Sequence, residues 1–90
     1  MGSAAVKIKI MPDSPDADLI EIEQKATQII ESENGKIVKV EHEPIAFGIN
    51  AIMITFAWQE DAEREVLEEK LAKVPHVNSA EVVDFRRAFG

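Results

Sequence analysis

Apolar and polar residues follow two periods along this chain, and the segments with a period of two predict four strands. Val6, Ile8 and Ile10 alternate with lysines in the first of these segments, as in a strand with one buried face. The third segment is apolar on both faces, which indicates a central strand of a sheet. The predicted strands span residues 4–11, 36–42, 49–58 and 80–86.

The second and fourth predicted strands carry specific expectations about their faces and ends. Regular alternation predicts two same-face sets, which are Val38 with Val40 in the second strand and Ala80 with Val82 and Asp84 in the fourth. Proline cannot donate to a strand ladder, so Glu43 and Pro44 are expected to end the second strand. The connection to the third strand is then a short turn over residues 44–48.

Two further segments have helical periodicity. The first spans residues 18–33, where Asp16 or Asp18 can cap the free amides of the first turn. Gly35 stands where a left-handed helix terminator belongs. The second helix opens at residues 59–61 and stops before Pro75. Its predicted core face consists of Ala62, Val66, Leu67, Leu71 and Val74.

The order of the predicted elements is strand, helix, strand, strand, helix, strand. This order predicts an α+β fold, the ferredoxin-like βαββαβ sandwich, in which two helices cover one face of a four-stranded antiparallel sheet. We expect one domain over residues 1–90. Right-handed crossovers place the turn at residues 44–48 and the C-terminal tail at opposite ends of the sheet. Strands of roughly seven residues would separate these two ends by about 20–25 Å.

Composition and charge narrow the function. A net charge of −7 argues against direct binding of nucleic acid, because such proteins concentrate lysine and arginine to displace phosphate counterions. The chain has no cysteine, which removes disulfides and thiolate chemistry and fits a reducing cytoplasm. No apolar run approaches the roughly 20 residues that span a bilayer, so we expect no membrane contact.

The residues that usually carry catalysis in this fold are missing. The loop at residues 11–17 is acidic and without glycine, so it would repel phosphate. His42 and His76 fall on different elements, which argues against a zinc site. No general acid and base accompany a nucleophile, and we predict neither enzymatic activity nor a cofactor. Phe56 and Trp58 resemble the stacking aromatics of RNA-binding sheets, but core packing is the simpler interpretation.

Two segments have no purely structural explanation. Phe47 stands between Ala46 and Gly48 in a tight turn, where the ring either projects as an interface anchor or folds back to plug the end of the core. The tail carries Arg86 and Arg87 at the end of an acidic chain. These arginines form either a binding element or a frayed terminus.

The same residues resemble a known family. Residues 43–49 read Glu-Pro-Ile-Ala-Phe-Gly-Ile, which resembles the Pro-Ile-(Ala/Gly)-Phe-Gly-Ile turn of translation elongation factor 1-beta. Residues 8–16 and 82–87 are similar to the start and the end of its archaeal branch. The resemblance implies a guanine-nucleotide exchange factor for elongation factor 1-alpha, the GTPase that delivers aminoacyl-tRNA, with no further cofactor. In eukaryotic members the turn phenylalanine docks on the partner, and a basic residue near the C-terminus reaches toward the partner's magnesium site.

Transferred residue by residue, the resemblance assigns docking to Phe47 and the basic role to Arg87. One departure is that two lysines follow the Gly-Ile of the eukaryotic pattern where this chain has Asn50 and Ala51. Another is that the late basic residue of that pattern is a penultimate lysine, whereas Arg87 is followed by three residues, so Arg86 is an alternative to it. The predicted partner-binding residues are Pro44, Ile45, Phe47, Gly48, Ile49, Arg86 and Arg87. We expect the protein to act as a monomer. The alternative is a small-molecule-binding regulatory domain of the same topology, with its ligand pocket at a dimer interface.

Overall fold

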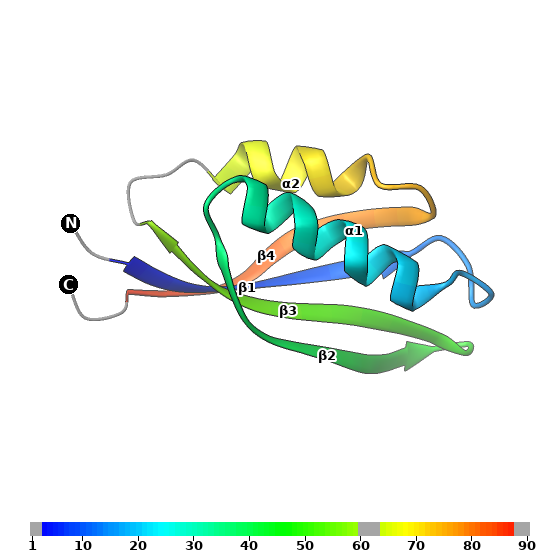
Figure 1. Cartoon of the computed structure of the whole chain (residues 1–90). Helices are drawn as coiled ribbons and strands as arrows, with labels where there is room; N and C mark the ends of the chain where they lie inside the picture. Colours follow the sequence, from blue (N-terminus) through cyan, green and yellow to red (C-terminus); the bar gives the residue numbers. More distant parts are fainter. Residues whose placement is uncertain (1–2, 60–63, 88–90) are drawn as a thin grey trace.

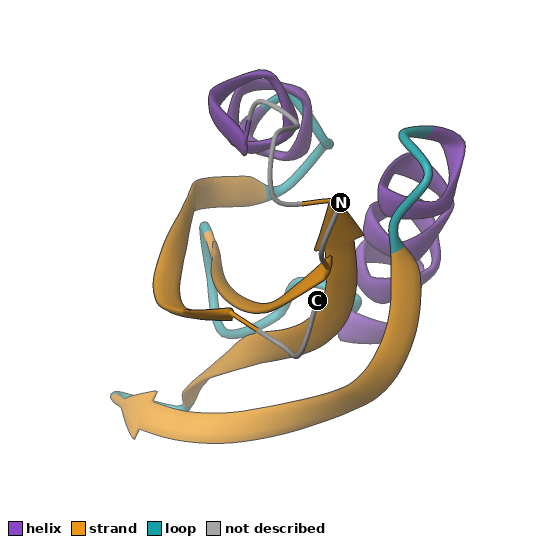
Figure 2. Ribbon diagram, turned by 90° about the vertical axis from the view of Figure 1, so that its left-hand side faces the viewer, coloured by secondary structure: helices purple, strands orange, loops and turns teal. Residues whose placement is uncertain are grey.

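A computed structural model describes residues 3–59 and 64–87 of the chain, and its six elements occur in the predicted order (Figure 1). They are β1 (Ser3–Pro12), α1 (Leu19–Ser32), β2 (Lys36–Ala46), β3 (Ile49–Gln59), α2 (Arg64–Ala72) and β4 (Val77–Arg87). The sheet is antiparallel with the order β2-β3-β1-β4, and both helices lie on one of its faces (Figure 2). The ferredoxin-like prediction is confirmed, as is the central position of β3.

The core forms between the two central strands and the helices. Val6, Ile8 and Ile10 of β1 are fully buried and pair with three residues of β3 that are equally buried, which are Phe56, Ile54 and Ile52. The helices add Ile22, Ala26, Ile30, Leu67 and Leu71 to this cluster. The rings of Phe56 and Trp58 meet edge to face with centroids 5.7 Å apart. The interpretation of these two aromatics as core residues is therefore confirmed.

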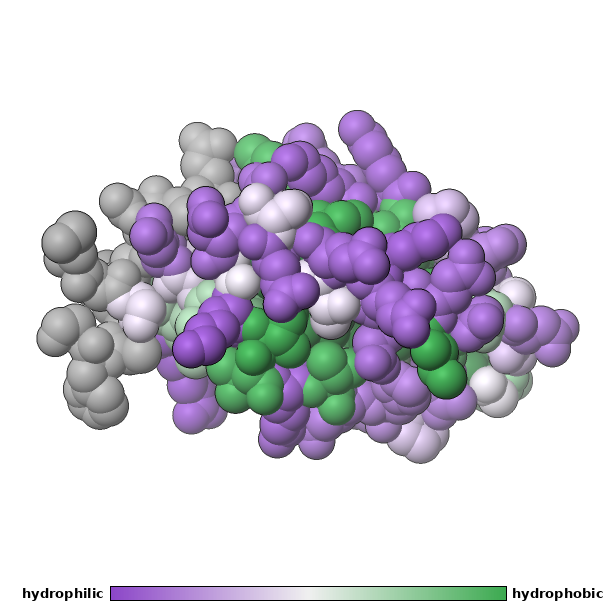
Figure 3. Space-filling view, in the orientation of Figure 1, coloured by the Kyte–Doolittle hydropathy of each residue, from purple (hydrophilic) through white to green (hydrophobic). Residues whose placement is uncertain are grey.

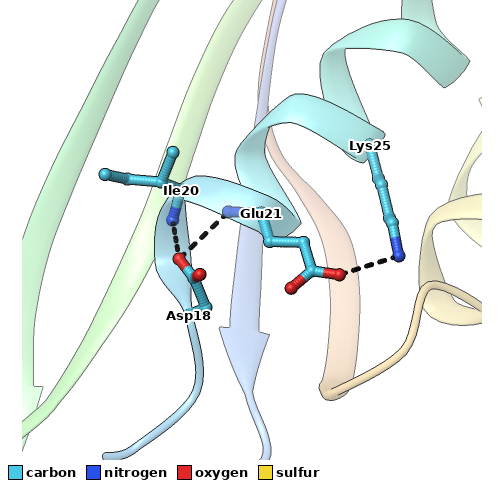
Figure 4. A network of polar contacts seen from close by, with 4 residues as sticks. All are labelled: Asp18, Ile20, Glu21 and Lys25. Atoms are coloured by element: carbon cyan, nitrogen blue, oxygen red, sulfur yellow. Dashed lines mark hydrogen bonds and ion pairs between the residues drawn. The ribbon is translucent and has the colours of Figure 1, made fainter.

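Asp18, and not Asp16, caps the first helix. Its side-chain oxygen Oδ1 accepts hydrogen bonds from the backbone amides of Ile20 and Glu21, at 3.1 and 3.2 Å (Figure 4). These amides have no carbonyl partner within the helix, so the carboxylate takes the place of the carbonyl acceptors that a preceding turn would provide. Glu21 also pairs with Lys25, one helical turn further on, at 3.1 Å.

The left-handed residue that ends α1 is Asn34, so the prediction for Gly35 is wrong by one position. Asn34 has φ 71°. The Gly35 amide donates to the Ile30 carbonyl and the Asn34 amide to the Glu31 carbonyl, which is the double closure of a Schellman motif. Gly35 is needed for space instead, because a Cβ atom there would lie 2.5 Å from Cγ2 of Ile30.

Pro44 does not end β2, contrary to expectation, because β2 is an edge strand. Its residues pair with β3 through Ala46, and Pro44 lies opposite Asn50. An edge strand needs hydrogen bonds on one side only, so a residue without an N–H is tolerated there. The register shifts between Pro44 and Ala46, which leaves Ile45 as an extra residue of a bulge.

A second bulge in β2 changes which side chains face the helices. Ile37 pairs with Phe56, and after the shift Val40 pairs with Ile54, so these two residues pack on the core. Val38 is the extra residue and is 66% exposed, and the predicted pairing of Val38 with Val40 on one face is wrong. Figure 3 shows apolar surface over this part of β2, below α1.

β4 contains a comparable irregularity. Val82 pairs with Ile8 and Asp84 pairs with Lys7, so Val83 has no partner of its own. As a result Phe85, and not Asp84, joins Ala80 and Val82 against the core. The simple alternation predicted for this strand is wrong beyond Val82, because one extra residue reverses the faces of those that follow.

The second helix agrees with its prediction in part. Leu67 and Leu71 are buried as expected, and Val74 is buried just beyond the end of the helix at Ala72. Val66 is 37% exposed, so its assignment to the core is wrong. Gln59 is the last residue of β3, so its assignment to the start of the helix is wrong. Residues 60–61 and the predicted core position Ala62 lie outside the described residues.

Substitutions at the end of α1 test the separate roles of the two residues there. Gly35→Ala is expected to lower the free energy of unfolding by about 1–3 kcal/mol, because the new methyl group overlaps Ile30. Asn34→Gly places a glycine in a left-handed position and should leave stability within about 0.5 kcal/mol of the original. Urea unfolding followed by circular dichroism measures both. Equal losses in the two variants would contradict the division of roles.

Candidate functional site

The turn between β2 and β3 is shorter than the expected segment 44–48. Ala46 pairs with Ile49, so Phe47 and Gly48 alone connect the strands. Both have positive φ, 53° and 76°, which is the signature of a type I′ hairpin turn. A two-residue turn between paired strands fixes the backbone of its tip, so the position of the Phe47 Cα and Cβ atoms is set by the sheet.

Phe47 projects into solvent with 94% of its surface exposed. The interpretation of the ring as a prominent side chain is confirmed, and the alternative that it plugs the core is wrong. Placing a residue other than glycine in the left-handed region costs about 1–2 kcal/mol of folding free energy. Asn or Gly normally occupies this position of the turn. Burial does not offset that cost here. The phenylalanine is therefore unexplained by the stability of the folded chain, as is common for strained residues at functional sites.

The other predicted residues of the hairpin surround this ring. Pro44, Ile45 and Gly48 are exposed, and Ile49 is half-buried at the start of β3. The loop between β1 and α1 lies beside the turn, since a Cβ atom on Gly48 would meet Cβ of Pro15 at 3.8 Å. The hairpin therefore exposes three apolar side chains, those of Pro44, Ile45 and Phe47, at the end of the sheet.

The two arginines lie at the other end of the molecule. Arg86 pairs with Ala5 and Arg87 pairs with Ala4, at the end of β4 (Figure 1). The Arg86 side chain is exposed, and its Nε lies 3.2 Å from Oδ2 of Asp84. The prediction that the turn and the arginines occupy opposite ends of the sheet is confirmed.

The separation of the two ends exceeds the predicted 20–25 Å. Trp58, the β3 partner of Ala4, lies nine residues along β3 from Ile49, a rise of about 30 Å. The strands have 10 or 11 residues and not seven, because the pairing continues through Pro44 to the turn. The longest dimension of the chain is 41 Å, so the two regions lie near its extremes.

The two histidines lie in separate pairs with acidic side chains. Nε2 of His42 lies 2.9 Å from Oε1 of Glu23, and Nδ1 of His76 lies 3.8 Å from Oδ2 of Asp13. These pairs belong to different regions, and within residues 3–59 and 64–87 no three His, Asp or Glu side chains gather to hold a metal ion. Over the same residues, no helix is long and apolar enough to cross a membrane.

An open groove of about 480 Å³ lies between the helices. Its lining includes Ile29 and three lysines, of which Lys25 and Lys70 already pair with Glu21 and Glu33 at 3.1 and 2.9 Å. Pro44, Ile45, Phe47, Gly48, Ile49 and Arg86, the predicted partner-binding residues whose side chains are described, do not line this groove.

Sequence reasoning missed Glu68 of α2. The Val82 amide donates to Oε2 of Glu68 at 2.8 Å, in a partly buried contact between α2 and β4. Hydrophobic periodicity carries no signal for such a bond, because the acceptor is one of several glutamates on the helix and the bulge beside it breaks the alternation.

Comparison with known proteins identifies the family. The EF-1 guanine nucleotide exchange domain matches residues 5–88 of the chain. The chain belongs to that family. Its function is guanine-nucleotide exchange, so it is an exchange factor and not an enzyme. The resemblance seen in the hairpin and the two terminal segments is confirmed, and exchange is favoured over small-molecule regulation.

Archaeal relatives match the exchange domain over almost its whole length. Elongation factor 1-beta of Methanosarcina barkeri is 41% identical, and the match covers 97% of this chain and 99% of the relative. Elongation factor 1-beta of Methanobrevibacter smithii is 40% identical, with 97% of this chain and 98% of the relative covered.

Two solved structures share the fold at low identity. The C-terminal domain of the MgtC protein from Mycobacterium tuberculosis superposes with a TM-score of 0.72 at 10% identity, over 97% of this chain and 89% of that chain. The ACT domain from GTP pyrophosphokinase of Chlorobium tepidum gives 0.63 at 19% identity, over 88% of this chain and 96% of that chain. These similarities show the fold alone.

Replacing Phe47 tests whether its left-handed backbone conformation lowers the stability of the folded domain. Phe47→Asn introduces the residue that type I′ turns prefer, and we expect the free energy of unfolding to rise by about 0.5–1 kcal/mol. Thermal unfolding should show an increase in Tm of about 4 °C for a domain of this size. Val38 is an exposed apolar residue of the preceding strand β2, and Val38→Asn should give no gain in Tm. A lower Tm for Phe47→Asn would contradict this interpretation.

Proposed function

We propose that this chain promotes the exchange of GDP for GTP on elongation factor 1-alpha during translation elongation, and that it binds this GTPase through two contacts at opposite ends of its sheet. The observation that carries the proposal is the exposed Phe47 in a strained two-residue turn. We further propose that residues 1–90 act as one exchange domain, as a monomer, in the cytoplasm, without a cofactor, metal ion or nucleic acid of its own.

The first contact is the hairpin tip. Phe47 enters an apolar pocket of the partner, with Pro44, Ile45, Gly48 and Ile49 forming the surrounding surface. Burying an aromatic side chain removes roughly 150–250 Å² from water, or about 4–6 kcal/mol at 25 cal/mol per Å². The short turn fixes the backbone before binding, so docking costs little backbone entropy, although the exposed ring still loses rotamer freedom. This contact supplies affinity and anchors the domain.

The second contact is the basic end of β4. Arg86 or Arg87 approaches the site where magnesium bridges the phosphates of the bound nucleotide, and a positive charge there competes with the metal ion. The exchange factor must bind the empty GTPase more tightly than the loaded one, and by reciprocity it lowers nucleotide affinity by the same factor. A thousand-fold effect requires about 4 kcal/mol of differential binding.

Release of a fluorescent GDP from elongation factor 1-alpha tests the function. We expect the protein to accelerate release in a concentration-dependent manner, and unchanged release would overturn the proposal. Phe47→Asn should raise the half-saturating concentration by about ten-fold or more, which corresponds to a loss of at least 1.4 kcal/mol of binding. Val38→Asn is the matched control and should behave as the unaltered protein.

The arginines are tested by their effect on the maximal rate. Arg87→Gln or Arg86→Gln removes one charge, and the variant that loses the residue at the metal site should lower the maximal release rate by about ten-fold with little change in half-saturation. Added magnesium should slow release more strongly in that variant than in the unaltered protein. If Phe47→Asn and both arginine variants retained full stimulation, the site assignment would be wrong while the function stood.

A further inference from the structure

The last four residues of β4 follow an irregularity that determines how they leave the sheet. Val82 and Asp84 pair with the adjacent residues Ile8 and Lys7, so Val83 is inserted between them and is 45% exposed. A bulge of this kind bends its strand and increases the local twist. The direction of residues 84–87 is therefore set at Val83.

The bulge also decides which face each of these residues occupies. The buried side chains of β1 mark the face toward the helices, and Ala5 lies on the other face as the partner of Arg86. With Val83 in regular pairing, Asp84 would continue the series of Val82 toward the core and Arg86 would lie on the helix side. The observed arrangement keeps Asp84 outside, where its carboxylate pairs with Arg86 at 3.2 Å.

Glu68 of α2 contacts the backbone at this point. Its Oε2 accepts the Val82 amide at 2.8 Å in a partly buried position, and α2 runs beside β4 (Figure 1). Hydrogen bonds from a backbone amide to a carboxylate are short and strong compared with neutral ones. β4 is an edge strand with a neighbour on one side only, so this bond ties its bend to the helix.

We propose that Glu68 is a positioning residue for nucleotide exchange: by holding the Val82 amide it fixes the bend at Val83 and so sets the direction in which the end of β4, with whichever of Arg86 and Arg87 makes the basic contact, meets the partner. This inference rests on the proposed function of the two arginines. It assigns to α2 a role in the rate of exchange, although Glu68 itself makes no contact with the partner.

The first experiment compares three variants of α2 in the GDP-release measurement. Glu68→Ala removes the acceptor and should lower the maximal release rate by about ten-fold, with half-saturation unchanged within about two-fold, because the Phe47 contact is intact. Glu68→Gln retains an amide oxygen that accepts the same bond and should keep most of the rate. Glu69→Ala removes the same charge from the adjacent exposed position and should have no effect. Hydrogen exchange at the Val82 amide should be faster in Glu68→Ala and not in Glu69→Ala.

Deletion of Val83 tests the bend independently of Glu68. The neighbours Val82 and Asp84 would keep their partners in a regular ladder, so the domain should fold while the end of β4 loses its bend. We expect the maximal release rate of the Val83-deleted protein to fall as much as that of Glu68→Ala. In a protein that carries both changes, the loss of maximal rate should be smaller than the sum of the two separate losses on a logarithmic scale.

The outcomes separate this inference from the function on which it rests. If the unaltered protein fails to accelerate release, the proposed function falls and the inference with it. If the unaltered protein accelerates release and a folded Glu68→Ala or Val83-deleted protein retains its full maximal rate, the positioning role alone is overturned. A rise in half-saturation without a change in maximal rate would also overturn it.

Discussion

The pairing of β1 with β3 fixes the position of every other part of the molecule. Four buried residues of β1 lie opposite four buried residues of β3, and a shift by one residue would turn all eight away from the helices. The loss of that buried apolar surface would exceed the marginal stability of a small domain. Because this register is fixed, the hairpin at one end and the arginines at the other are held at a constant separation.

The edge strands are less constrained, and the candidate binding residues lie on them or in the turn that follows. β2 has two bulges and a proline, and β4 has two irregularities in its pairing with β1. A central strand must satisfy partners on both sides, whereas an edge strand accommodates an extra residue toward solvent. The Phe47 turn and the Arg86 segment each follow one of these irregularities. The central strands therefore set the separation of the two candidate contacts, and the bulged edge strands set the direction in which each one leaves the sheet.

Sequence periodicity was sufficient for the fold because the central strands and α1 follow regular patterns. Val6, Ile8 and Ile10 alternate without interruption, and Asp18 precedes its helix as a capping residue should. The same reasoning failed at Val38 and Asp84, where one inserted residue changes the faces of those that follow. It failed at Pro44 because the edge position of β2 depends on strand order.

The candidate site could be predicted from the sequence only in part, because some of its properties depend on contacts between distant segments. The family pattern pointed to Phe47, but its exposure and positive φ are properties of the folded turn. Glu68 was not recognisable at all, since its bond to Val82 depends on where α2 meets the bend in β4. Local sequence patterns predict individual helices and strands. Contacts between helices and strands that are distant in the chain are seen only in the structure.

The conformation of the Phe47 turn has a consequence for how such sequences change over evolutionary time. Selection for folding alone favours asparagine or glycine at the first position of this turn, so drift would remove the phenylalanine from any lineage in which it had no other role. A descendant that lost its binding partner would gain stability by the first such substitution. Under the docking role proposed for Phe47, phenylalanine at this position marks a working interface, and its replacement by asparagine would mark descendants that have abandoned exchange.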